Sequence, residues 1–394
     1  MDFDVVIVGG GLAGASLAAA LAGSSLRIAL IERRQPAAPG PEWDSRVYSL
    51  TPASIAFLDE IGVWSRLEEG RITPVYEMRV FGDDRRSKLR FSAYEAGVQQ
   101  LAATVESNRL QHALWQALER QRNLTLLCPG APGQLRSVKG GVEIGLEAGR
   151  SLSTRLAVGA DGADSWLRHA AGIRVRRRSY AQQGVVANFA CARMHRNAAY
   201  QWFRQDGVLA YLPLPQERVS IVWSTSDAHA RELLTLPPAQ FCRRVAEAGG
   251  EALGSLEPLT PPTAFPLISM NAGQLARDRV ALVGDAAHVV HPLAGQGINL
   301  GFGDAHALAD LLRDAPDAGD RLLLRRFERA RAEDILAMRF VTDGLYRLFN
   351  ADYPAIARIR NLGLNLTDSL PVIKTLLARR AIGAGGGLYH KEPS

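Results

Sequence analysis

The chain has 394 residues, of which 47% are hydrophobic and 22% are charged. A single hydrophobic core stops growing at roughly 250 to 300 residues, so this length predicts at least two domains. No apolar run reaches the roughly 18 to 20 residues of a membrane-spanning helix, which excludes a helical integral membrane protein. The net charge of +6 equals the excess of basic over acidic residues in 321–394, so we expect no general affinity for nucleic acid.

The N-terminus and the cysteines predict the cellular compartment. Asp2 and Asp4 precede the first apolar run, which does not resemble a secretory signal, so we expect a cytoplasmic protein. The three cysteines, Cys128, Cys191 and Cys242, lack the paired spacing of a zinc site. We therefore expect reduced thiols and no bound metal.

The first 32 residues predict a strand, a helix and a second strand around a glycine-rich turn. Residues 4–8 and 27–32 are short apolar runs, and residues 12–21 form a helix of small residues. The turn has the G-x-G-x-x-G spacing, which allows a tight bend and lets a pyrophosphate approach the helix N-terminus. An acid at the end of the second strand suits a ribose without a 2′-phosphate, which favours FAD or NAD over NADP. The predicted cofactor contacts are Gly9, Gly10, Gly11, Leu12, Ala13, Gly14, Glu32 and Arg33.

Other stretches predict two kinds of sheet. Residues 124–129 and 156–161 are short apolar strands that suit a buried parallel sheet. Residues 77–93 predict a hairpin, and residues 208–225 predict two strands joined by a turn.

The predicted fold class is therefore α/β plus β. A Rossmann-like nucleotide-binding domain is interrupted twice by an antiparallel-sheet domain for the substrate, and a helical segment follows. The predicted division assigns 1–76, 99–175 and 271–334 to the first domain, 77–98 and 176–270 to the second, and 335–394 to the C-terminal helical segment.

A second glycine-rich segment distinguishes between FAD and NAD. Residues 284–288 (GDAAH) follow the apolar strand that begins at residue 279, and residues 292–301 (PLAGQGINLG) open a helix. Asp285 suits the ribityl or diphosphate part of FAD. The free amides and positive dipole at the helix start would stabilise negative charge on a reduced flavin. An NAD dehydrogenase needs no such loop, so the sequence predicts FAD.

Further motifs add to these two loops: DSRVYSL (44–50), VESNRLQHALW (105–115), GADGADSWLR (159–168) and VGDAAHVVHPLAGQGINLG (283–301). Together they resemble the group A flavoprotein aromatic hydroxylases, and more narrowly the ubiquinone-biosynthesis hydroxylases that act on polyprenyl phenols. The resemblance continues through VLAYLPLP (208–215) and TDSLPVIKTLLARRAIG (367–383), so it covers nearly the whole chain.

The resemblance implies roles for several residues. Arg46 matches the arginine that reaches the flavin, and Asp285 matches the flavin-binding aspartate. Asp161 lies in the motif placed near the pyrophosphate and the passing nicotinamide cofactor. For Arg109 two interpretations stay open, a contact with FAD phosphate or a helix cap. The residues that match the wall and floor around the isoalloxazine are Pro292, Gly295, Gln296, Gly297, Ile298 and Asn299.

The resemblance also implies the chemistry, which is hydroxylation of a phenol ring. NAD(P)H binds transiently and reduces FAD, O₂ adds at flavin C4a, and the hydroperoxide transfers OH to a carbon ortho or para to the phenol oxygen. FAD carries this reaction, and the protein orients the reactants and excludes water. Two alternatives stay open: a hydroxylase of another small aromatic substrate, and a flavin-dependent isoprenoid reductase.

A base near the flavin would speed the reaction by deprotonating the phenol. His291 is the candidate because imidazole titrates near neutral pH, although a hydrogen-bonded supporting role is the alternative. His288 is expected to be structural. Tyr211 and Trp223 either line the substrate pocket with Pro292 or belong to the core of the sheet.

The C-terminal segment predicts a surface function. Residues 335–382 alternate apolar and basic residues, which predicts short amphipathic helices. Because a polyprenyl substrate resides in a membrane, the basic side chains predict loose binding to an anionic membrane surface or to other ubiquinone-biosynthesis proteins. The alternative is a helical cap with a solvated basic face.

Overall fold

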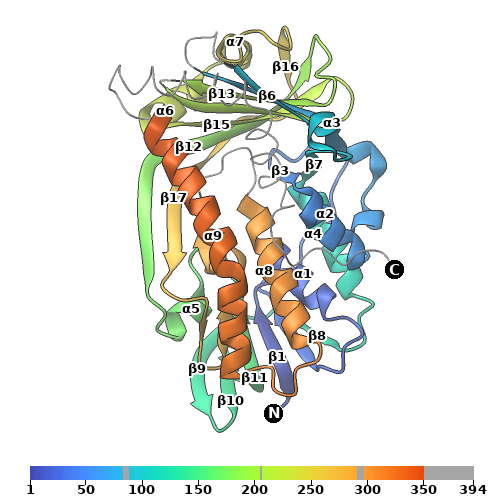
Figure 1. Ribbon diagram of the computed structural model, residues 1–394, viewed down its shortest axis with the longest axis vertical. Helices are drawn as coiled ribbons and strands as arrows, with labels where there is room; N and C mark the ends of the chain where they lie inside the picture. Colours follow the sequence, from blue (N-terminus) through green and yellow to red (C-terminus); the bar gives the residue numbers. More distant parts are fainter. Residues whose placement is uncertain (83–87, 205, 291–296, 350–394) are drawn as a thin grey trace.

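The computed structural model describes residues 1–82, 88–204, 206–290 and 297–349, with side chains described as far as residue 338. Its strands form an eight-stranded, a nine-stranded and a three-stranded sheet. Figure 1 shows the nine-stranded sheet at one end of the molecule and the eight-stranded sheet at the other.

The eight-stranded sheet has a parallel centre in the order β19-β11-β1-β2-β8. Val5, Val6 and Ile7 are fully buried, which explains why the first strand is a continuous apolar run. Its strands are β1 (Phe3–Val8), β2 (Ile28–Ile31), β8 (Leu124–Leu127), β9 (Pro132–Val138), β10 (Gly141–Leu146), β11 (Ser151–Gly159), β18 (Ala276–Arg277) and β19 (Val280–Leu282). The predicted strands at 4–8, 27–32, 124–129 and 156–161 are confirmed.

Helices cover this sheet and connect it to the rest of the chain. In α1 eight of nine residues are buried, because small side chains allow it to pack closely against neighbouring helices. The helices are α1 (Leu12–Ala20), α2 (Pro52–Glu60), α3 (Ala93–Ala96), α4 (Ser107–Leu118), α5 (Trp166–Ala170), α6 (Asp227–Thr235), α7 (Pro238–Ala248), α8 (Gly297–Leu312) and α9 (Arg321–Phe349), with 3-10 turns η1 (Trp64–Arg66), η2 (Glu69–Arg71) and η3 (Gly284–Ala286). Figure 1 shows α8 and α9 side by side.

The nine-stranded sheet has the order β20-β17-β12-β15-β14-β13-β5-β6, with β16 beside β12. Its strands are β5 (Glu77–Phe81), β6 (Lys88–Ser92), β12 (Val175–Cys191), β13 (Ala198–Arg204), β14 (Gly207–Leu214), β15 (Arg218–Ser226), β16 (Leu256–Pro258), β17 (Thr263–Ala272) and β20 (His288–Val289). The predicted hairpin and the predicted strand pair are confirmed, and both belong to this one sheet. The sheet is antiparallel except where β13 pairs with β5 in parallel, because these two strands come from separate parts of the chain.

The three-stranded sheet lies between the two larger sheets and has the order β3-β7-β4. Its strands are β3 (Val47–Leu50), β4 (Thr73–Val75) and β7 (Ala102–Glu106). Val47 contacts Leu212 and Leu214 of β14, and Val75 and Ala102 contact Ala199 of β13. One face of the nine-stranded sheet therefore looks toward the nucleotide-binding part of the chain.

Helix α9 differs from the predicted tail. It runs without interruption from Arg321 to Phe349, so the proposed boundary at residue 335 falls inside a helix. Residues 350–394 lie outside the described residues. Across the described part of the chain, no helix combines the length and apolar character needed to cross a membrane. The remaining division into two discontinuous domains stays a proposal, which the change of sheet after residue 76 supports.

Candidate functional site

The turn after β1 can be built only from glycine at two positions. Gly9 has φ +103°, and a Cβ there would stand 2.4 Å from the Ala160 carbonyl oxygen. A Cβ at Gly14 would stand 2.0 Å from the Gly9 carbonyl oxygen. The loop, α1 and the end of β11 therefore meet backbone to backbone, as the sequence predicts.

Gly11, by contrast, faces open space. It caps α1 without a side-chain hydrogen bond, and no described atom lies within 4 Å of the position its Cβ would take. The first amides of a helix have no intrahelical acceptor and carry partial positive charge. An open helix N-terminus of this kind fits a pyrophosphate, so the donor set suits the predicted dinucleotide.

Glu32 and helix α4 hold the loop from two sides. Glu32 Oε2 accepts a hydrogen bond from the Gly10 amide at 2.7 Å, while its neighbour Arg33 is exposed. The Gly10 carbonyl accepts bonds from Gln111 Nε2 at 2.7 Å and Trp115 Nε1 at 2.8 Å. Sequence reasoning missed these two α4 residues, although their spacing of four places them on one helix face.

The second glycine-rich segment touches the first. Gly284 has φ +60°, and a Cβ there would stand 2.9 Å from the Ala13 Cβ. No described atom lies within 4 Å of a Cβ at Gly297, where α8 begins. Asn299 in the first turn of α8 accepts a bond from the Thr51 amide and donates to the Ser49 carbonyl, both at 2.9 Å. Ile298 beside it is half-buried against the core. The starts of α1 and α8 and the strand β3 are thus brought together.

Arg46, Tyr48 and Asp285 converge where these elements meet. Burial raises the pKa of the Asp285 carboxyl, and His288 and Arg46 oppose this. Burial also raises the pKa of the Tyr48 phenol, while Arg46 and Ser107 act to lower it. Arg46 therefore lies near both groups. Tyr48 was not predicted as a site residue, because an aromatic residue in a short strand usually belongs to a core.

A buried cluster of charged side chains around Asp304 holds the turn that carries Asp285. Asp304 Oδ2 accepts bonds from His288 Nε2 at 2.6 Å and from the Gly284 amide at 3.0 Å, and Oδ1 accepts from Arg331 Nε at 2.8 Å. Burial opposes ionisation of Asp304, but His288 and Arg331 outweigh it and lower the pKa of its carboxyl. This bonding agrees with the structural role expected for His288.

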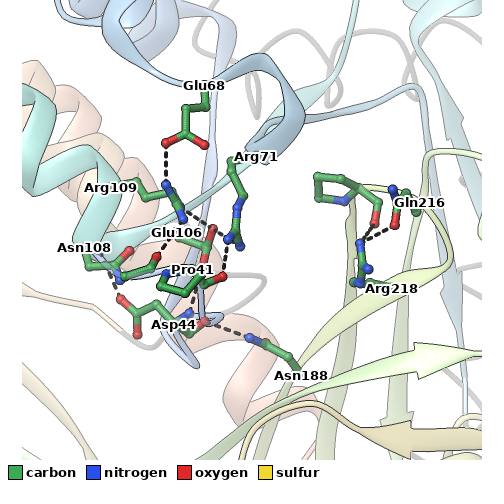
Figure 2. A network of polar contacts seen from close by, with 12 residues as sticks. Pro41, Asp44, Glu68, Arg71, Glu106, Asn108, Arg109, Asn188, Gln216 and Arg218 are labelled. Atoms are coloured by element: carbon green, nitrogen blue, oxygen red, sulfur yellow. Dashed lines mark hydrogen bonds and ion pairs between the residues drawn. The ribbon is translucent and has the colours of Figure 1, made fainter. Parts of the chain in front are cut away.

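Figure 2 shows a second buried network, centred on Glu106. The Glu106 side chain is fully buried and accepts bonds from Arg109 Nε at 3.0 Å and Arg71 at 3.3 Å. Arg109 also donates to Glu68 at 2.7 Å and to the Gly40 carbonyl at 3.0 Å. Every guanidinium nitrogen of Arg109 thus has a protein acceptor, which favours a structural role over the phosphate contact.

Asp44 connects this network to Arg46 and to the nine-stranded sheet. Its amide donates to Glu106 at 2.8 Å, and its carboxylate accepts from the amides of Arg46 at 2.9 Å and Asn108 at 3.0 Å. Its carbonyl accepts from Asn188 Nδ2 of β12 at 2.8 Å (Figure 2). The backbone that carries Arg46 is therefore fixed on three sides.

The remaining predicted residues have varied positions. The Asp161 carboxylate accepts bonds from the Ser165 hydroxyl and the Leu167 amide, so it stabilises the start of α5 beside the loop. His291, Pro292, Gly295 and Gln296 lie outside the described residues.

Tyr211 and Trp223 require a correction. Both side chains are buried in the cluster formed with α6 and α7, and the Tyr211 hydroxyl donates to the Val245 carbonyl at 2.7 Å. Leu212, the next residue along β14, contacts Val47 on the opposite face. Because side chains alternate along a strand, Tyr211 and Trp223 point away from the nucleotide-binding part. They belong to the core, and their assignment to the substrate pocket is wrong.

This chain is similar to several known proteins. Residues 2–338 match the family model described as FAD binding domain. The chain is 35% identical over 386 residues to the 3-demethoxyubiquinol 3-hydroxylase of Escherichia coli, which covers 96% of this chain and 98% of that protein. It is 36% identical over 385 residues to ubiquinone hydroxylase UbiL of Rhodospirillum rubrum, with 96% and 89% covered. The solved structure of PqsL from Pseudomonas aeruginosa with 2-aminobenzoylacetate matches with a TM-score of 0.78, 25% identity and coverage of 92% and 99%.

The two facing glycine segments and the open helix start define a flavin-dependent oxidoreductase. The chain belongs to the FAD binding domain family, and FAD is its cofactor. Together with the hydroxylases it resembles over nearly its whole length, this makes it an FAD-dependent monooxygenase.

The open space at Gly11 can be tested by filling it. Gly11→Val leaves the fold intact, because no described atom obstructs the side chain, but blocks the expected pyrophosphate position. We expect the purified variant to fold, as measured by circular dichroism, and to carry little or no flavin absorbance. Gly70→Val, also without a neighbour within 4 Å, is the control and should keep its FAD. Stoichiometric FAD in Gly11→Val contradicts the assignment.

The Glu106 network predicts a large effect on stability. Glu106→Ala leaves Arg71 and Arg109 largely buried without their shared partner, which costs about 3 kcal/mol or more in comparable cases. Urea unfolding of the holoenzyme should show this loss, whereas Glu119→Ala at the exposed end of α4 should change stability by less than about 0.5 kcal/mol. Equal stabilities of the two variants would refute the role of the network.

Proposed function

We propose that this enzyme hydroxylates the aromatic ring of a polyprenyl phenol in ubiquinone biosynthesis, using NAD(P)H and O₂. The observation that carries this proposal is the sequence identity of 35% and 36% to two ubiquinone-pathway hydroxylases, each over 96% of the chain. The family match over residues 2–338 spans both glycine segments and the loop that carries Arg46. The proposal therefore concerns the substrate and pathway of an FAD-dependent monooxygenase.

The proposed cofactor contacts follow the geometry. The α1 N-terminus at Gly11 binds the pyrophosphate, and Glu32 accepts a bond from ribose beside Gly10. Asp285 and the start of α8 at Gly297 hold the ribityl chain and ring. Arg46 approaches the ring from the loop that Asp44 fixes. The close approach of Gly284 to Ala13, which brings the two glycine segments together, supports this assignment.

Bound FAD supplies the redox chemistry, accepting electrons from NAD(P)H and activating O₂ for transfer of one oxygen atom to the ring. The chain has no second G-x-G-x-x-G turn in a strand-helix-strand frame. The nicotinamide cofactor therefore binds transiently, and Asp161 lies in the motif expected beside it. His291 remains the proposed base that holds the phenol proton.

The sheet face that looks toward the nucleotide-binding part suits an apolar ring. Most of its residues are small or aliphatic and exclude water, which keeps a reactive oxygen donor from side reactions. They include Val80, Val186, Ala199, Ala210, Leu212 and Val222, each less than 10% exposed. This face supports a prenylated, weakly polar substrate over a charged one.

A second candidate is hydroxylation of another small aromatic compound. The structure of PqsL, which was determined with 2-aminobenzoylacetate, is similar to this chain at 25% identity. This similarity favours the alternative. An isoprenoid reductase of the same fold is the third possibility. These candidates differ in the substrate that is consumed and in whether oxygen is gained.

Labelled oxygen tests the reaction class. With ¹⁸O₂ and a short-chain prenyl phenol, the product mass should rise by one labelled oxygen atom, because the transferred atom derives from O₂. Mass spectrometry of parallel reactions in H₂¹⁸O should show no label. Label from water alone, or a reduced product without added oxygen, refutes the monooxygenation of this substrate.

We also propose that the enzyme works at an anionic membrane surface. The exposed face of α9 carries several arginines together with two exposed leucines, Leu322 at 68% and Leu336 at 65%. The arginines are Arg321, Arg325, Arg326 and Arg329. Each basic residue near such a surface contributes about 1 kcal/mol of attraction. In the sequence, the excess of basic over acidic residues continues through residues 321–394.

Vesicle flotation tests the membrane proposal. The enzyme should bind anionic vesicles at low salt and dissociate at high salt, because the attraction is electrostatic. Arg379→Glu with Arg380→Glu, and separately Arg325→Glu with Arg329→Glu, should each weaken binding while FAD content is kept. Arg176→Glu with Arg178→Glu, in the exposed first part of β12, makes the same charge change elsewhere and should bind normally. Equal binding to neutral and anionic vesicles contradicts the proposal.

A further inference from the structure

The register of the nine-stranded sheet sorts its residues onto two faces. Tyr211 faces α7, whereas Leu212 faces Val47 and the nucleotide-binding part. Gln201 of β13 lies opposite Ala210 of β14, one residue before Tyr211. Because side chains alternate, Ala210, Leu212 and Gln201 share the face that looks toward the nucleotide-binding part.

Gln201 is the polar member of an otherwise aliphatic row on this face. The row runs across the sheet through paired residues: Val80 beside Gln201, then Ala210, then Val222. Gln201 is only 4% exposed, and its neighbours in the row are exposed by 3 to 7%. The surroundings of Gln201 would therefore suit an aliphatic side chain better than an amide.

The side-chain amide of Gln201 makes no hydrogen bond to any residue in the described part of the chain. Burying an amide without a partner is costly, and replacement by an apolar group of the same shape is neutral or stabilising. Farther along the same face, the paired residues Asn188 and Ser220 each have one side-chain oxygen, Oδ1 and Oγ, that is buried without a hydrogen-bond partner. Asn188 has a structural role through its bond to Asp44, but no described residue gives the Gln201 amide a partner, so a bound molecule is the natural partner for Gln201.

We propose that Gln201 determines substrate specificity by hydrogen-bonding an oxygen substituent of the aromatic ring. The amide can donate to a methoxy oxygen or accept from a hydroxyl, and the aliphatic row beside it contacts the ring. A site built around one such amide discriminates strongly against an analogue that lacks the matching oxygen. This inference rests on the proposed function and names the residue that recognises a ring substituent of the substrate.

The test compares Gln201→Leu with the wild-type holoenzyme. Binding of a short-chain prenyl phenol with several ring oxygens, and of analogues that each lack one of them, is followed by the change in flavin absorbance. We expect Gln201→Leu to bind the parent about tenfold to a hundredfold more weakly. One analogue should bind wild type more weakly than the parent does, and this difference should vanish in the variant. Gln134→Leu, on exposed β9, is the matched control and should bind as wild type does.

Thermal unfolding separates a substrate contact from a structural one. If Gln201 serves the substrate, Gln201→Leu keeps its FAD and its melting temperature is unchanged or higher. Unchanged binding of the parent, or a lower melting temperature with loss of FAD, overturns the inference. Failure of the proposed function has a different signature: the wild type then hydroxylates none of the prenyl phenols. If it hydroxylates the parent and Gln201→Leu binds every analogue as wild type does, only the Gln201 inference fails.

Discussion

Contact of backbone with backbone around Gly14 is the constraint on which the rest of the structure depends. Because a Cβ there would stand 2.0 Å from the Gly9 carbonyl oxygen, α1 can lie directly against the turn that ends β1. This fixes the direction in which the first amides of α1 point. The same closeness lets Gly284 approach Ala13, so the second glycine segment and α8 are placed against α1. Two segments some 270 residues apart in sequence thus lie against each other.

Buried charged side chains hold the segment that carries Arg46. The segment that carries Arg46 has no regular structure before β3, yet Asp44 joins it to Glu106, to the start of α4 and to Asn188 of the nine-stranded sheet. Glu106 in turn accepts bonds from two arginines. A buried carboxylate between arginines tolerates little displacement, because each lost bond leaves a charge without a partner. The network therefore relates the position of the sheet to that of Arg46.

Local patterns in the sequence predicted the parts of the fold whose signals are local. The β1 turn, the hairpin of β5 and β6 and the glycine segment before α8 each show their turn residues within a few positions. The contacts of Gln111 and Trp115 with Gly10 could not be predicted, because about 100 residues separate them. The sequence could not decide between pocket and core for Tyr211 and Trp223, because both faces of their strands are buried and hydrophobicity does not reveal which face looks toward the cofactor. Glu106 gave no signal because a charged residue is usually exposed.

The two parts of helix α9 should differ in how well they tolerate substitutions. Arg331 of α9 supports the Gly284 turn, since it bonds to the same Asp304 carboxylate that accepts from the Gly284 amide, and Asp334 in turn pairs with Arg331. Substitutions there disturb the cofactor loop. Downstream of Asp334 the sequence can change in length and charge without breaking these bonds. A change in the segment after Asp334 therefore leaves the support of the cofactor loop in place.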